Sequence, residues 1–230
     1  MDTKLLRQRA RENLAGSWGL AIGVAVIASL LGALLTGSSF LPDLEVSATL
    51  KELSAELGYM APSISNDLRI NFSGNILGIA AFILGGVIQL GYCQFLLRQH
   101  DKKNPEFNDL FSYFDRFSDG FLQAFLRELY TLLWSLLFII PGIMAAYSYA
   151  MTPFLMVEYP ELTPREAINR SKDLMYGHKA DLFFLELSFI GWSILATLTL
   201  NIGNLWLNPY KNAARAAFYR ELTAQKQDIA

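Results

Sequence analysis

The chain has 230 residues, of which 53% are hydrophobic and 17% are charged. A soluble domain averages about 45–50% apolar and about 25% charged residues, so this composition is shifted toward that of membrane proteins. The net charge of -2 argues against nucleic-acid binding, which requires a basic stripe. A single cysteine, Cys93, excludes an intramolecular disulfide and a thiolate metal site, and His100 and His178 do not have metal-ligand spacing. We therefore expect no metal and no cofactor.

Long uncharged stretches divide the chain. A spanning helix needs about 20 mostly apolar residues, because the hydrocarbon core is ~30 Å thick and each residue rises ~1.5 Å. The stretch from Leu129 to Val157 holds no charged side chain, and neither do Trp18–Leu41 and residues 71–97. These stretches predict an integral membrane protein, with its first two helices at about Trp18–Leu35 and Asn75–Leu97.

The apolar residues from Phe121 to Glu158 are too many for one span. They hold Pro141 and Gly142 near their middle. Proline breaks the helical hydrogen-bond ladder and glycine permits a turn, so we expect one helix on either side of this pair.

The last apolar region, Leu182–Tyr219, shows a similar pattern. It contains polar and glycine residues at Asn201–Asn204 and a proline at Pro209. We expect two helices here, with a break near Asn201–Asn204 and with the second helix kinked at Pro209.

Basic residues suggest how these helices are oriented, because short loops rich in lysine and arginine stay cytoplasmic. They gather in the N-terminal segment, in inner segments 99–120 and 159–181, and at the end of the chain, whereas the outer loop 36–75 holds only Lys51 and Arg69. A four-helix arrangement would place segment 159–181 outside. Six helices place all four basic segments inside. We therefore predict an all-α, polytopic bundle of six transmembrane helices, arranged as three hairpins in a single domain with cytoplasmic amphipathic helices and both termini cytoplasmic.

One inner segment carries an aromatic stripe. Asn104-Pro105-Glu106 is typical of a helix start, with proline in the first turn. Phe107, Phe111 and Phe114 follow at helical spacing. This stripe suits a helix that lies in the membrane interface, either as an anchor or as a surface that binds a partner.

Each inner amphipathic segment is followed by a glycine and then by a membrane helix. The glycines are Gly16, Gly120 and Gly177. Glycine ends helices because it tolerates the left-handed conformation at the cap. One interpretation is a threefold repeat of an interfacial helix plus a transmembrane hairpin, and the alternative is three independent hairpins.

Several charged residues fall inside the predicted helices, where ionisable groups are energetically unfavourable and often functional. The candidates among them for an intramembrane polar site are Arg127, Glu128, Glu186 and Arg215. Glu186 is a candidate proton or cation site, paired with Arg215 or Arg127. The alternative is a structural ion pair near the cytoplasmic interface.

Several motifs resemble those of a known family: Leu133–Ile143 with its Pro-Gly-Ile sequence, Tyr147–Pro153, Ser171–His178 and Asn208–Tyr219. Together they resemble a bacterial integral membrane family known as domain of unknown function number 975, over nearly the whole chain. The resemblance implies a multi-pass protein of the bacterial cytoplasmic membrane. Pro-Gly-Ile and a Ser-x-x-Leu-x-x-Gly pattern are also distantly similar to the membrane domain of some glycerophosphodiester phosphodiesterases. The catalytic barrel of those enzymes is absent here, so no activity carries over.

No catalytic pattern is present: the sequence has no Ser-His-Asp arrangement, no phosphate-binding glycine loop and no metal motif. The first hypothesis is a non-enzymatic membrane organiser that binds membrane lipid or a membrane protein partner. The second is a small transporter or channel subunit that acts as a homo-oligomer, because broken helices often line transporter sites. The third is a lipid-modifying enzyme.

Overall fold

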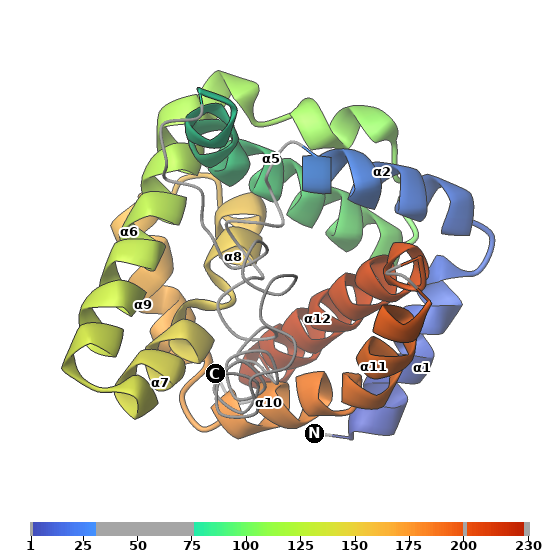
Figure 1. The fold of residues 1–230 in the computed structure, drawn as a ribbon. Coiled ribbons are helices and arrows are strands. Elements are labelled where there is room, and N and C mark those ends of the chain that lie inside the picture. Colours follow the sequence, from blue (N-terminus) through green and yellow to red (C-terminus); the bar gives the residue numbers. More distant parts are fainter. Residues whose placement is uncertain (1, 31–75, 200–201, 228–230) are drawn as a thin grey trace, which may run out of the picture.

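The computed structural model describes residues 2–30, 76–199 and 202–227, and within these ranges every regular element is a helix. The predicted all-α class is confirmed. The predicted outer loop 36–75 lies outside the described residues. Figure 1 shows α2 and α5 on one side of the molecule, the α6–α7 pair on another, and α12 crossing between them.

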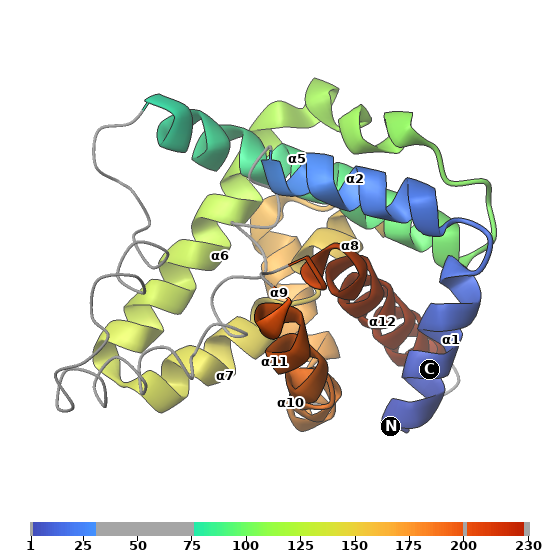
Figure 2. The same cartoon turned by 45° about the vertical axis from the view of Figure 1, so that its right-hand side comes forward.

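The two ends of the chain lie side by side. Helix α1 (Thr3–Leu14) begins at Asp2, whose side chain accepts a hydrogen bond from the Lys4 amide at 2.9 Å, and it packs along α12 (Asn204–Gln227). Gly16, with φ of +87°, turns the chain from α1 into α2 (Trp18–Leu30), as the sequence predicts. Figures 1 and 2 both show α1 beside α12.

Glycines let other segments approach α5 (Ile76–His100) closely. A Cβ atom on Gly91 would lie 2.2 Å from the carbonyl oxygen of Leu110, and one on Gly86 would lie 2.2 Å from the carbonyl oxygen of Gly120. The second half of α5 is therefore buried beneath the segment that follows it.

That following segment differs from the single interfacial helix predicted for it. It forms two short 3₁₀ helices, η1 (Phe107–Phe111) and η2 (Phe114–Arg116), before α6 (Phe117–Leu137). The prediction that Gly120 ends a helix is wrong, because Gly120 lies inside α6, where its missing side chain permits contact with Val87 of α5. One of the three glycines that suggested a repeat therefore has another role.

The break predicted at Pro141 and Gly142 exists, but it lies slightly earlier. Phe138 is extended, with φ of -159° and ψ of 151°, and separates α6 from α7 (Ile139–Tyr149). Pro141 lies in the first turn of α7, where backbone amides have no partner within the helix, so its missing N–H removes no helical hydrogen bond. Gly142 meets α6, since a Cβ there would lie 2.1 Å from Ser135 Oγ.

The helix predicted for residues 142–158 is interrupted at Ala150 and Met151, after which α8 (Thr152–Glu158) begins. Ser171 of α9 (Pro164–Leu174) satisfies the backbone groups freed there. Its hydroxyl donates to the Ser148 carbonyl at 2.8 Å and accepts from the Met151 amide at 3.2 Å. Pro153, in the first turn of α8, has no amide to continue the ladder of α7, so the sequence does hold a signal for this break, although it was not predicted.

The C-terminal apolar region forms α10 (Lys179–Leu187), α11 (Ile190–Leu198) and α12. The break predicted near Asn201–Asn204 lies between α11 and α12, and a further break after Leu187 was not predicted. Helix α12 continues through Pro209, so this proline does not end the helix. It stands near the N-terminal end, where its missing amide removes a single bond of a long ladder.

Two helical stretches among the described residues, Ile140–Glu158 and Lys179–Leu198, are long and apolar enough to cross a membrane. In the more apolar one, Lys179–Leu198, only 22% of the residues are buried within the protein. These two stretches are candidate spans by length and composition, and the six predicted spans stay a prediction.

Candidate functional site: a charged cavity between five helices

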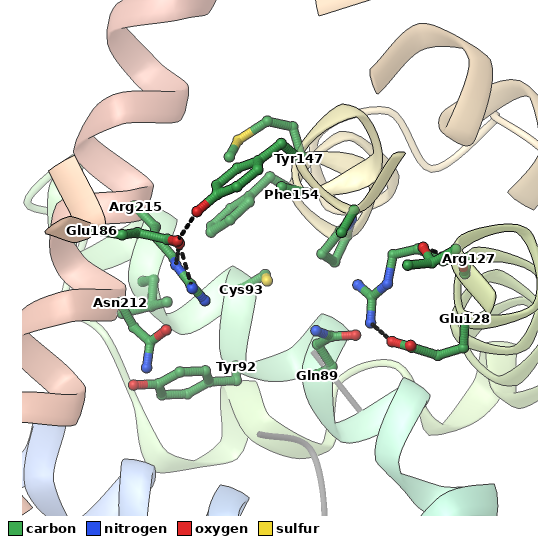
Figure 3. A pocket seen from close by; sticks show the side chains of 16 residues that line it. Gln89, Tyr92, Cys93, Arg127, Glu128, Tyr147, Phe154, Glu186, Asn212 and Arg215 are labelled. Carbon is green, nitrogen blue, oxygen red and sulfur yellow. Dashed lines mark hydrogen bonds and ion pairs between the residues drawn. The ribbon is translucent and has the colours of Figure 1, made fainter. Parts of the chain in front are cut away.

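A cavity of about 80 Å³ lies where α5, α6, α7, α10 and α12 meet, and its walls extend into α8 (Figure 3). All four charged residues singled out in the sequence line it. The tertiary structure thus brings together groups that are as much as 88 positions apart in the chain. The polar and ionisable side chains in its wall are Gln89, Tyr92, Cys93, Arg127, Glu128, Thr131, Tyr147, Glu186, Asn212 and Arg215.

Glu186 of α10 forms the most complete set of contacts in this wall. Its Oε1 atom accepts hydrogen bonds from Arg215 Nε at 3.0 Å and Arg215 Nη2 at 2.5 Å, and its Oε2 atom accepts one from the Tyr147 hydroxyl at 2.8 Å. The Glu186 and Arg215 side chains are 20% and 21% exposed. Both carboxylate oxygens are occupied, so the structure selects Arg215 from the two partners that the sequence offered.

Arg127 and Glu128 form the second ion pair, at 3.2 Å between Nη2 and Oε1. Neighbouring residues of one helix are not expected to pair, because their side chains leave the helix about 100° apart. The Arg127 side chain is 7% exposed and bends across to Glu128, which is 34% exposed. The arginine is thus the inner member of this pair and the glutamate is the outer one.

Helix α5 supplies the wall between the two ion pairs. Gln89, Tyr92 and Cys93 are buried and line the cavity, and Cys93 lies between Arg127 and Arg215 in Figure 3. Sequence reasoning missed these residues as a group. The available signal was their i, i+3 and i+4 spacing, which places the polar side chains of an apolar run on one helix face.

The predicted aromatic stripe is exposed, although it lies on 3₁₀ turns. The exposed fractions of Phe107, Phe111 and Phe114 are 39%, 42% and 40%, and the adjacent rings lie 5.8 and 5.7 Å apart. Leu110, fully buried against α5, and an ion pair from Arg98 to Asp109 at 2.5 Å hold the segment in place. The three rings therefore form an aromatic face on a well-fixed support.

Large apolar side chains are also exposed at the far ends of two helix pairs, α6–α7 and α10–α11. An apolar surface of this extent marks a contact with lipid or with another protein. More than half of the side chain is exposed in Leu132, Leu133, Leu136, Leu137, Phe138, Ile140, Met144, Phe184, Trp192, Ile194, Leu195 and Leu198.

Ion pairs join other helix ends. Arg220 of α12 contacts Glu158 at 2.6 Å and Asp101 at 2.7 Å, so it ties α12 to the ends of α8 and α5. Arg9 of α1 pairs with Glu221 of α12. These pairs gather the basic segments that the sequence placed on one side of a membrane.

Comparison with known families adds one finding. Residues 136–226 match the family model described as "Protein of unknown function (DUF975)". This confirms the resemblance to domain of unknown function 975 over residues 136–226, and its predicted extension over nearly the whole chain stays a prediction. The DUF975 match contains Glu186, Arg215 and Tyr147 but not the α5 and α6 walls of the cavity. No curated protein and no solved structure matches the chain.

The similarity to the membrane domain of glycerophosphodiester phosphodiesterases stays a prediction. Within the described ranges, no group of three or more histidine, cysteine, aspartate or glutamate side chains could hold a metal ion.

Proposed function

We propose that the protein is a multi-pass protein of the bacterial cytoplasmic membrane, with six spanning helices and both termini in the cytoplasm. The apolar side chains exposed on α6–α7 and α10–α11 support this proposal. Contact with water is unfavourable for such a surface, whereas contact with the hydrocarbon core of a bilayer is favourable. The two apolar stretches, Ile140–Glu158 and Lys179–Leu198, have the length that a bilayer requires. Arg220 pairs with Glu158, at the end of the first stretch that this proposal assigns to the cytoplasm, and with Asp101, in an inner segment.

We further propose that the protein is a non-enzymatic organiser that binds membrane lipid through its aromatic face. One observation carries this proposal: Phe107, Phe111 and Phe114 are exposed on a segment fixed to α5. Aromatic rings favour the headgroup region of a bilayer, where they bury an apolar surface beside a polar one. Because the segment is already ordered, binding requires little further loss of conformational entropy.

The test is native mass spectrometry of the protein purified in mild detergent. The wild type should retain one enriched lipid class, and the triple variant Phe107→Ser/Phe111→Ser/Phe114→Ser should lose it. A matched control is Tyr176→Ser, which removes an aromatic ring that is 83% exposed outside the aromatic face. Equal lipid retention by the triple variant and the control would overturn the role of this face. A co-purified membrane protein that only the triple variant loses would reassign the face to a protein partner.

The cavity favours a second function, that of a small transporter or channel subunit acting as an oligomer. Two ion pairs face a shared space between helices that are interrupted at Phe138, at Met151 and after Leu187. Interrupted helices often line the solute sites of transporters. In proteoliposomes, Glu186→Gln should reduce solute or proton flux under the second function and leave it unchanged under the first.

A further inference from the structure

We propose that the cavity is a binding site for a small oxyanion, such as a phosphate or carboxylate group, held between the guanidinium groups of Arg215 and Arg127. This inference names the class of ligand that the cavity would bind. It rests on the second proposed function only if the bound ligand is also transported. The two arginines come from α12 and α6, and their side chains enter the cavity from opposite walls (Figure 3).

In the Glu186–Arg215 pair, the groups that can still form hydrogen bonds are N–H donors of Arg215. Both oxygens of Glu186 are occupied, by Arg215 and by Tyr147, so this carboxylate has little left to offer a cation. An arginine has five N–H donors, and Glu186 accepts from only two nitrogen atoms of Arg215. The pair therefore presents a cationic edge to the cavity.

The different burial of the charged groups also favours an anion in the cavity. Arg127 is nearly buried whereas Glu128, its partner, is one-third exposed, so water screens the glutamate more than the arginine. The formal charges of the four residues cancel, and Glu186 and Arg215 are about equally exposed, but Arg127 lies deeper than Glu128. The potential at the centre, near Cys93, is thus favourable for an anion.

Size and geometry select a small ligand. A volume of about 80 Å³ admits a small anion with a few waters, since one water needs at least about 10–15 Å³ by the same measure. It does not admit an entire phospholipid, although a headgroup phosphate is small enough. Planar guanidinium groups match the spacing of two oxygen atoms in phosphate and carboxylate groups, so two opposed arginines can hold an oxyanion from both sides. The amide of Asn212 and the hydroxyl of Tyr92 line the same space.

The test measures binding and not flux. Inorganic phosphate, and acetate in a parallel series, are titrated into the full chain in mild detergent by calorimetry, at fixed ionic strength with chloride as the balancing anion. We expect saturable binding to the wild type and at least about tenfold weaker binding to Arg127→Gln. Arg9→Gln is the matched control, since Arg9 also pairs with a glutamate but lies on α1, outside the cavity.

A second variant removes both charges of the Glu186–Arg215 pair, so that no unpaired buried charge impairs folding. Glu186→Gln/Arg215→Gln keeps polar side chains at both positions and should also lose phosphate binding. The inference is overturned if wild type gives no saturable binding of either anion. It is equally overturned if both cavity variants bind phosphate as Arg9→Gln does.

Native mass spectrometry of the same samples identifies the source of the oxyanion. A bound phospholipid that added phosphate displaces indicates a lipid headgroup, whereas a site that is free of lipid and binds phosphate indicates a free ion. Both results support the oxyanion site. Phosphate binding without any solute flux would rule out the transporter function and retain the oxyanion site. Solute flux without oxyanion binding would rule out the oxyanion site and retain the transporter function.

Discussion

At the residue scale, the Glu186–Arg215 pair is both a candidate site and a structural contact between α10 and α12. The two side chains are about four-fifths buried, so removing one charge leaves the other poorly solvated. Breaking a fully buried pair destabilises a protein by about 3–5 kcal/mol, and the partial exposure here lowers that figure.

We predict that Glu186→Gln lowers the free energy of unfolding by about 1–3 kcal/mol, because it leaves Arg215 without a carboxylate in a poorly solvated place. The melting temperature in detergent measures this loss. Glu221→Gln is the control, since its partner Arg9 is 41% exposed and exposed pairs contribute about 0–1 kcal/mol. The double variant Glu186→Gln/Arg215→Gln should recover part of the loss. Equal melting temperatures for Glu186→Gln and the wild type would contradict the prediction.

A close contact at Gly91 gives a second residue-scale prediction. Gly91→Ala places a Cβ against the Leu110 backbone, which cannot move without displacing η1 from α5. We expect the free energy of unfolding to fall by roughly 1–3 kcal/mol, which is typical of overpacking. Gly19→Ala in α2 is the control, because a Cβ there meets nothing within 4 Å. That change should be neutral or stabilise by about 0.5–1 kcal/mol, since alanine favours a helix over glycine. Equal melting temperatures for Gly91→Ala and Gly19→Ala would contradict the close contact at Gly91.

At the scale of elements, the start of α9 is determined by residues that are close together in the sequence. Thr163 and Glu166, three positions apart, form a capping box: the Glu166 carboxylate accepts hydrogen bonds from the Thr163 amide at 2.9 Å and the Thr163 hydroxyl at 2.7 Å. Gly177, with φ of +82°, then turns the chain toward α10. Both boundaries follow from neighbours in sequence, which explains why they could be predicted.

The capping box gives a prediction about pH. The hydrogen bonds from Thr163 hold the pKa of Glu166 below its ordinary value of 4.5. A carboxylate whose pKa is lower in the folded state stabilises the fold above its unfolded pKa, and this contribution is lost as the pH falls through the folded pKa. We therefore expect Glu166→Gln to speed amide hydrogen exchange at the start of α9 at neutral pH. As the pH falls from 4.5 through the folded pKa, the variant and the wild type should converge, and a difference that does not shrink over this range would contradict this role.

At the scale of the whole molecule, the arrangement of basic segments determines the topology. Six spans place Lys172 of α9, an exposed residue, in the cytoplasm, whereas four spans place it outside. In a Cys93→Ser background, we predict that an impermeant thiol reagent added to intact cells does not label Lys172→Cys but does so after permeabilisation. Ser54→Cys, in the predicted outer loop, is the control and should be labelled in intact cells. Labelling of Lys172→Cys in intact cells would favour four spans.

The sequence by itself determined the helical class, the candidate charged residues and the boundaries that depend on adjacent residues. The glycine turns at Gly16 and Gly177, and the break near Pro141, depend on backbone conformation, which local residue type restricts strongly. Pro153 is a local signal for the break at Met151, but only the tertiary structure shows that the hydroxyl of Ser171 on another helix bonds the backbone groups freed there.

The same distinction applies to the candidate site. The sequence identified Arg127 and Glu186 as energetically unfavourable in an apolar helix, but it could not identify the cavity that they share. That cavity exists because Arg215 reaches Glu186 from α12 while α5 places Cys93 and Gln89 between the two arginines. Such contacts depend on how helices pack, and helix packing is determined by the shapes of all the side chains at an interface and not by any one segment.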